Sequence, residues 1–413
     1  MTFFKRYDNK LRLVVNSMSS AMSVSVGIFV GAGSVLENDK NNGISHFIEH
    51  MTFKGTDKMT AFDVSEAFDE IGSAVNAFTS KEMTCYYVKS TVSALERSFE
   101  VLSDMFLKST YLPEEIEREK GVVVEEINMC EDTPEEVCFD GLSAAFFGDE
   151  GLGRTILGSA ETVKSFDKSF IDDYRKDYYN ADNIVISFSG NVDEKTAQKL
   201  IERHFLPFVS TNKSKDYFRT TKVNLGKIVK KNKDIEQNHL AIAFEGVRYN
   251  GKYFDELSIL NGVLGGGMSS RLFQKIREEL GLCYTVYSTP SSYRDVGSLC
   301  IYAGLNPTQT KQAYDAVFEV LRDLKKNGIT QKEFEKGKAQ VLSAFAFGQE
   351  LSSSQMRMLG KYVLFENDVL EMEDYMQEIE NIKKDRVDDL LNSLDFEKFS
   401  LSLVGKDVDK IDL

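Results

Sequence analysis

Apolar and polar residues alternate in several short segments of the chain, and this alternation predicts β-strands. The segments S-V-S-V-G-I-F-V from Ser23 and H-L-A-I-A-F-E-G from His239 both show it. Other segments have apolar residues at helical spacing, and some predicted strands follow one another with no helix between them. Consecutive strands of this kind are typical of a largely antiparallel sheet with helices packed mainly on one face. We therefore expect an α+β fold.

Two stretches of the chain share one pattern of apolar and charged residues. F-E-V-L-S-D-M-F-L-K-S begins at Phe99 and F-E-V-L-R-D-L-K-K-N begins at Phe318, and each continues into an amphipathic helix after a short turn. The segments N-I-V-I-S-F-S-G from Asn183 and F-S-L-S-L-V-G from Phe399 both predict a strand that runs into a glycine turn. The chain is therefore predicted to contain two homologous domains that arose by duplication.

A polar segment separates the two predicted domains. S-T-N-K-S-K-D-Y-F-R-T-T-K, at residues 210–222, lacks apolar periodicity and is expected to be a linker. The first α+β domain would then comprise residues 1–209, and the second would comprise residues 223–413.

Composition limits the classes of partner and compartment. The chain has 413 residues and a net charge of −15, which argues against a nucleic-acid-binding surface and favours basic or neutral partners. No uninterrupted apolar run is long enough for a membrane span, and the first residues lack the features of a secretory signal. Five cysteines without a CxxC pair are typical of reduced thiols. We therefore expect a cytoplasmic protein that does not associate with membranes.

The segment G-I-S-H-F-I-E-H-M-T-F-K-G-T, residues 43–56, contains two of the chain's four histidines. On a helix, His46 and His50 lie about 40° apart, and Glu49 lies about 60° to the other side of His46. Two imidazoles at this spacing can bind one Zn²⁺, and a carboxylate beside them can take a proton from the attacking water. This H-x-x-E-H pattern predicts a catalytic zinc site, which requires a third protein ligand.

The acidic helix E-I-E-R-E-K-G-V-V-V-E-E-I contains candidates for the third ligand. Glu119 and Glu126 are seven residues apart, so they lie on one face of the helix, about 20° from each other. One can bind zinc while the other supports a ligand through a hydrogen bond; a solvated glutamate-rich helix has the same pattern. The repeat favours a site, because the aligned residues of the second half are Gly337 and Ala344 and its corresponding helix has no histidine.

At these residues the chain resembles the M16 family of zinc peptidases, the group of pitrilysin and the mitochondrial processing peptidase. H-F-I-E-H-M-T-F-K-G-T is similar to the family signature, the similarity extends over essentially the whole chain, and the length resembles that of the bacterial half-size members. The resemblance implies a zinc-dependent endopeptidase or oligopeptidase with one Zn²⁺ per chain, bound in the first domain, and a metal-free second domain. It implies His46, His50 and Glu126 as ligands, Glu49 as general base and Glu119 as the carboxylate behind a ligand.

Two further segments resemble parts of the family's substrate-binding site. V-N-A-F-T-S-K-E-M-T-C-Y-Y is similar to the edge strand on which family members align a peptide, which implies Asn76, Ala77 and Phe78 as contacts. R-E-E-L-G-L-C-Y implies that Arg277 and Tyr284, from the metal-free domain, help to hold the peptide carbonyl. The alternatives are an ordinary Thr/Tyr-rich strand, an exposed helical arginine and a core tyrosine.

Half-size family members pair, so the resemblance also implies a homodimer in which the Arg/Tyr segment of each chain completes the site of its partner. Phe53 is expected to line an apolar pocket on the leaving-group side. Glu136 and Asp140 match positions at which the processing peptidases recognise an arginine of the substrate, which implies basic peptide substrates. An exposed acidic turn explains these two residues equally well. The alternative function is a non-catalytic, peptide-binding subunit of the same fold, although such relatives usually lack part of the H-x-x-E-H set.

Overall fold

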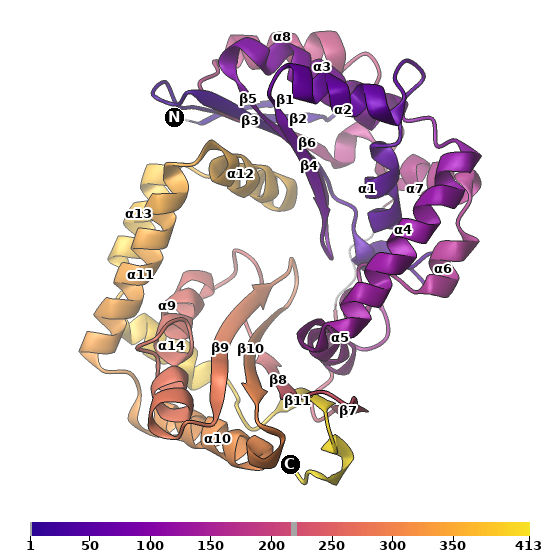
Figure 1. Cartoon of the computed structure of the whole chain (residues 1–413). Helices are drawn as coiled ribbons and strands as arrows, with labels where there is room; N and C mark the ends of the chain where they lie inside the picture. Colours follow the sequence, from indigo (N-terminus) through magenta and orange to yellow (C-terminus); the bar gives the residue numbers. More distant parts are fainter. Residues whose placement is uncertain (1, 216–220) are drawn as a thin grey trace. The chain divides into compact units, whose positions relative to one another are not determined.

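The computed structural model describes residues 2–215 and 221–413. The chain forms two compact units, each built around one β-sheet (Figure 1). The first unit comprises Met1–Ile127, Thr155–Phe218 and Phe347–Met372, and the second comprises Asn128–Arg154, Arg219–Ala346 and Glu373–Leu413.

The sheet of the first unit has six strands in the order β1-β2-β6-β3-β5-β4. Strands β2 and β6 are parallel, and every other neighbouring pair is antiparallel. Strand β4 therefore lies at an edge of the sheet. The strand bounds are β1 (Thr2–Arg6), β2 (Arg12–Ser17), β3 (Ser23–Val30), β4 (Ala74–Thr79), β5 (Thr84–Thr91) and β6 (Ile184–Gly190).

The sheet of the second unit repeats this plan without the extra strand β1. Its order is β7-β11-β8-β10-β9, with β7 and β11 parallel and the other pairs antiparallel. The order and directions match β2-β6-β3-β5-β4 strand for strand, which confirms the predicted α+β fold of two homologous halves. The bounds are β7 (Ile228–Asn232), β8 (Asn238–Glu245), β9 (Cys283–Ser292), β10 (Gly297–Leu305) and β11 (Phe399–Gly405).

Most of the helices that pack on a sheet cover one face of it, as expected. In the first unit, side chains such as Leu13, Val15 and Ile28 bury that face against α1 (Ile44–Thr52), α2 (Ala61–Glu70), α3 (Leu95–Lys108), α7 (Lys168–Tyr178) and α8 (Glu194–His204). In the second unit, Ile242 and Leu403 pack against α9 (Phe254–Leu264), α10 (Thr310–Asn327) and α14 (Lys384–Ser393). These two clusters are the main cores.

One helix lies on the opposite face of each sheet. Helix α12 (Ser352–Glu366) packs on β2, β3 and β6, and it approaches so closely that a Cβ on Gly360 would lie 2.2 Å from the Phe29 ring. Helix α5 (Pro134–Phe147) packs on β8 and β11, where a Cβ on Gly141 would lie 2.7 Å from Ser402 Oγ. Each helix therefore comes from one sequence repeat and packs on the sheet of the other.

This exchange explains why the compact units cross the predicted domain boundary. Apolar periodicity shows that α5 and α12 have a buried face, but it does not show which sheet covers that face. The division at residues 210–222 follows the sequence repeat and stays a prediction; of that segment, residues 216–220 lie outside the described residues.

The two predicted helix pairs are present. Helix α3 is followed by α4 (Pro113–Asp132), and α10 is followed by α11 (Gln331–Gln349). Among the described residues, the remaining α-helices are α6 (Ala160–Ser165) and α13 (Met372–Asn381). Among the described helices, none combines the length and apolarity that a membrane crossing would need.

Candidate metal centre

Helix α1 carries the paired histidines and is anchored at its first turn. Gly43, which precedes it, has a φ of 96°, and a Cβ at this residue would lie 2.5 Å from the carbonyl oxygen of Leu157. The buried carboxylate of Glu37 accepts hydrogen bonds from the backbone N–H groups of Gly43 (2.7 Å) and Ser45 (2.9 Å). These bonds satisfy donors that the helix itself leaves unpaired. The apolar side of the helix, with Phe47, Ile48 and Met51, is fully buried in the core.

The histidines converge with one glutamate of α4. Oε2 of Glu126 lies 3.7 Å from Nε2 of His46 and 3.4 Å from Nε2 of His50. Within residues 2–215 and 221–413, these three side chains are the one group of His, Cys, Asp and Glu residues whose ligand atoms all lie within 4.8 Å of one another. All three belong to the first unit.

The donor set fits a zinc ion. Ligands at about 2.1 Å from a tetrahedral Zn²⁺ lie roughly 3.4 Å from each other, which is close to the separations between Glu126 and the histidines. Two imidazoles and one carboxylate also leave a fourth position open, as catalytic zinc sites require. The residues present therefore match the metal that the H-x-x-E-H pattern predicts.

Glu119 has a different position from Glu126. It is 2% exposed, and its Oε1 lies 2.8 Å from Nδ1 of His50. Its other oxygen, Oε2, lies 2.6 Å from Nζ of Lys54. Helical spacing alone did not show which of the two glutamates would bind the metal. The structure distinguishes them: Glu126 faces the Nε2 atoms, and Glu119 contacts the opposite side of the His50 ring. Sequence reasoning missed Lys54, although it lies one helical turn beyond His50.

Burial and neighbouring charges shift the pKa values of the two histidines in opposite directions. Burial, together with the charge of His50, lowers the pKa of His46 to about 3, so this imidazole is neutral near pH 7. Burial would also lower the pKa of His50, but the hydrogen bond and charge of Glu119 raise it overall. A proton on Nδ1 of His50 faces Glu119 and leaves Nε2 as the electron-pair donor. Nδ1 of His46 is buried and has no hydrogen-bond partner among the described residues.

Glu49 lies on the same face of α1 and is held by the edge strand. The hydroxyl of Thr79, the last residue of β4, donates a hydrogen bond of 2.5 Å to Oε2 of Glu49. Burial raises the pKa of Glu49, and the hydrogen bond from Thr79 opposes that rise. Thr79 lies in the segment that sequence analysis assigned to substrate binding, but no sequence rule indicated that it contacts Glu49.

The predicted substrate contacts lie on β4. Asn76 is exposed, and its Oδ1 accepts a hydrogen bond of 2.8 Å from the backbone N–H of Ala77. Phe78 packs on the face that α12 covers, with its ring centroid 6.3 Å from that of Tyr87. Phe53 directly follows α1 and is partly buried against the main core of the first unit.

Arg277 and Tyr284 belong to the second unit, whereas His46 belongs to the first. Arg277 lies in a π-helix, Phe273–Glu279, and its guanidinium carbon is 4.7 Å from the centroid of the Phe273 ring and 4.7 Å from that of Tyr284. Tyr284 is 75% exposed, so the alternative of a core tyrosine is wrong. The pair thus forms a cation–π contact in which Tyr284 is exposed and Arg277 is partly buried.

The predicted specificity residues Glu136 and Asp140 also belong to the second unit. They are exposed and lie four residues apart on α5, so they share one face of a helix and do not form an acidic turn.

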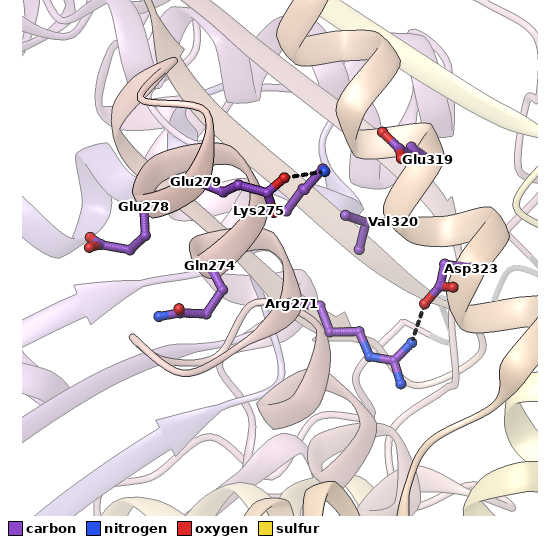
Figure 2. Close-up of a pocket in the computed structure, with 8 residues that line it drawn as sticks. All are labelled: Arg271, Gln274, Lys275, Glu278, Glu279, Glu319, Val320 and Asp323. Carbon is purple, nitrogen blue, oxygen red and sulfur yellow. Dashed lines mark hydrogen bonds and ion pairs between the residues drawn. The ribbon is translucent and has the colours of Figure 1, made fainter.

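The second unit also contains an open pocket of about 650 Å³ between residues 271–279 and α10 (Figure 2). Its cations are paired with carboxylates, Arg271 with Asp323 at 3.1 Å and Lys275 with Glu279 at 2.7 Å. None of the predicted site residues lines it.

Two family models match the chain. The model described as insulinase (peptidase family M16) matches residues 12–160, the part that contains His46, His50 and Glu126. The model described as the peptidase M16 inactive domain matches residues 165–341. Together they cover most of both sequence repeats.

Similar proteins are found among bacterial relatives and solved structures. The chain is 40% identical over 406 residues to the uncharacterized zinc protease YmxG of Bacillus subtilis, covering 97% of this chain and 98% of the relative. It is 34% identical over 401 residues to an uncharacterized zinc protease of Mycobacterium leprae, covering 96% and 89%.

Two solved structures share the fold. A protease from Helicobacter pylori superposes with a TM-score of 0.91 at 21% identity, covering 98% of this chain and 99% of the other. A peptidase M16 inactive domain from Pseudomonas fluorescens superposes with a TM-score of 0.91 at 18% identity, covering 98% of both. With these matches over nearly its full length, the chain belongs to peptidase family M16, among the half-size bacterial members.

Proposed function

We propose that this chain is a zinc-dependent endopeptidase or oligopeptidase. The observation that carries the proposal is the convergence of His46, His50 and Glu126, with ligand atoms within 4.8 Å of one another, on the side of α1 that also carries Glu49. The relatives named as zinc proteases support the same metal and the same class of reaction. A bound Zn²⁺ would polarise the scissile carbonyl and lower the pKa of the attacking water.

The chain's own residues would prepare the reaction. Glu49 would accept a proton from the attacking water and pass it to the leaving amine. His46, kept neutral by burial, presents an electron pair without first losing a proton. Glu119 fixes the His50 ring through Nδ1, so that Nε2 stays directed toward Glu126.

Strand β4 would bind the peptide. It is an edge strand next to α1, so an extended peptide can add to the sheet through main-chain hydrogen bonds. Asn76, Ala77 and Phe78 would be the contact residues. Main-chain hydrogen bonds of this kind provide affinity that depends little on side-chain identity, so any selectivity would come from side-chain contacts elsewhere in the site.

We propose that Arg277 and Tyr284 act on the site of a second copy. The exposed Tyr284 hydroxyl and the neighbouring guanidinium could donate hydrogen bonds to the carbonyl oxygen as negative charge develops on it. One chain carries both the metal-binding residues and this pair, so a homodimer would contain two complete sites. A cytoplasmic location stays a prediction.

We propose that exposed carboxylates favour basic peptide substrates. Glu136 and Asp140 would attract a basic side chain of the peptide, and Phe53 would contribute to an apolar pocket on the leaving-group side. The test is competition between peptides that differ only in carrying Arg, Lys or a neutral residue near the cleaved bond. A preference for Arg supports this assignment, and equal rates for the three peptides contradict it.

The proposed function is tested by removing and restoring the metal. A chelator should abolish cleavage of a quenched peptide, and one equivalent of Zn²⁺ per chain should restore it, with products identified by mass spectrometry. A non-catalytic, peptide-binding subunit would bind zinc and peptide without cleaving the peptide. That result, obtained with the metal-loaded chain, would overturn the proposal.

A further inference from the structure

We infer that Thr79 is a positioning residue that holds Glu49 in the orientation required of a general base. The inference rests on the proposed function of Glu49. It concerns a residue that neither the histidine motif nor the zinc-ligand pattern includes. Strand β4, which would bind the peptide, thereby also holds the general base Glu49.

The hydroxyl hydrogens of Thr79 and Thr84 can each be assigned to one acceptor. The Thr84 hydroxyl donates to the backbone carbonyl of Ala32 at 2.9 Å. Thr79 Oγ1 lies 3.5 Å from Thr84 Oγ1 and 2.5 Å from Oε2 of Glu49. A threonine hydroxyl has one hydrogen to donate, and the short distance to a carboxylate oxygen assigns that hydrogen to Glu49.

Glu49 has no other hydrogen bond within the described ranges, 2–215 and 221–413. One of its oxygens is therefore fixed by Thr79, and the second is left to receive a proton. Without the hydroxyl, the carboxylate would rotate among several orientations, and only some of them face the space beside His46 and His50. Reaction rate depends steeply on such alignment.

The location of Thr79 gives the hydrogen bond rigidity. Thr79 is the last residue of β4 and pairs with Thr84 in the antiparallel ladder. Strand β5 in turn pairs with the central strand β3. A donor fixed by backbone pairing holds Glu49 more firmly than a side chain on a loop would.

Two substitutions at Thr79 separate positioning from packing. Thr79→Val keeps the branched shape and the preference for a strand but removes the donor. Thr79→Ser keeps the donor. We expect Thr79→Val to lower kcat about 10- to 100-fold, the loss typical of a partner that orients a site residue, while KM and zinc content stay within about twofold. Thr79→Ser should recover most of kcat.

A threonine at the other end of β5 serves as the control. Thr91→Val removes an exposed hydroxyl that lies 3.2 Å from Oγ of Ser93 and has no contact with Thr79 or Glu49 in the described residues. This variant should keep kcat and zinc content nearly unchanged. All variants are compared on the same peptide, and zinc is measured on the assayed samples.

The outcomes distinguish this inference from the proposed function. If Glu49→Gln abolishes cleavage but zinc-loaded Thr79→Val retains full kcat, the positioning role is wrong and the proposed function stands. If Thr79→Val loses zinc in proportion to activity, or if Thr79→Ser fails to restore kcat, Thr79 has only a structural role. If Glu49→Gln cleaves peptide at the normal rate, the proposed function itself fails.

Discussion

The Nζ atom of Lys54 lies 2.6 Å from Oε2 of Glu119, and the other oxygen of this buried carboxylate lies 2.8 Å from Nδ1 of His50. A carboxylate this far from water needs a compensating charge to stay ionised. The hydrogen bonds from His50 and Lys54 supply it and lower the pKa of Glu119 against the opposing effect of burial. A lysine outside the H-x-x-E-H motif therefore supports one of its histidines.

Lys54→Met should weaken zinc binding. Without the ammonium group, the Glu119 carboxylate is less stable in its ionised form and holds the His50 ring less firmly. We expect the zinc dissociation constant to rise about 10- to 100-fold, measured by competition with a chelator of known affinity. Lys54→Arg keeps the charge and should change affinity much less. An unchanged dissociation constant in Lys54→Met would show that the ion pair does not support the metal site.

Glu126→Gln should abolish binding of one zinc per chain, because an amide oxygen lacks the charge of the carboxylate ligand. The matched control is Glu125→Gln, which removes the same charge from the adjacent, exposed residue of α4. Metal content after dialysis, measured by mass spectrometry of the elements, should be near one per chain in the control and near zero in Glu126→Gln. Equal zinc contents would remove Glu126 from the ligand set.

Arg277→Ala should lower kcat without changing zinc content, because Arg277 belongs to the unit that lacks the metal-binding residues. If each site is completed by a partner, mixing Arg277→Ala with Glu49→Gln should restore activity. A mixed dimer has one site with an intact Glu49 and an intact Arg277 from the other chain. We expect about half of the wild-type activity per mixed dimer. A mixture no more active than the sum of its two components would contradict completion in trans.

Glu333 provides a test of pH-dependent stability in the second unit. Its two carboxylate oxygens accept hydrogen bonds of 2.7 and 2.9 Å from Arg271, and these bonds, opposed by burial, lower its pKa from 4.5 to about 2. A group with a depressed pKa in the folded state stabilises the fold fully above its unfolded pKa, and this contribution disappears as the pH falls through its folded pKa. Glu333→Gln should therefore reduce stability by about 2 kcal/mol near pH 7.

The difference between wild type and Glu333→Gln should narrow as the pH falls from about 4.5 toward 2. Thermal midpoints measured across this range provide the comparison. Glu335→Gln, an exposed change on the same helix whose partner is the neutral Gln331, should show little effect at any pH. A difference that stays constant down to the lowest pH at which the chain folds would contradict the ion pair's role.

Much of the fold could be predicted from the sequence because its elements are locally encoded. Alternating strands such as β3 and the helix pairs α3–α4 and α10–α11 follow directly from apolar periodicity. The repeat also predicted that both halves share one plan, and the strand orders agree with it. The exchange of α5 and α12 was not predictable, because a helix with an apolar face fits either sheet until their shapes are compared, as at Gly360 against Phe29.

The candidate site, like the fold, could be predicted only in part from the sequence. Helical geometry was enough to group His46, Glu49 and His50, because they lie within one turn and a half of one helix. It could not decide between Glu119 and Glu126, whose roles depend on the distance between α4 and α1. The roles of Lys54 and Thr79 could not be predicted from the sequence, because each residue acts through one side-chain contact whose partner lies far away in the sequence.

The central claim is that Glu49 performs proton transfer at a metal site that forms without it. The most direct measurement compares wild type and Glu49→Gln, with zinc content and peptide hydrolysis determined on the same samples. We predict about one zinc per chain in both proteins and a loss of kcat of about 10²- to 10⁴-fold in the variant. Hydrolysis at the wild-type rate by zinc-loaded Glu49→Gln, or no hydrolysis by zinc-loaded wild type, would contradict it.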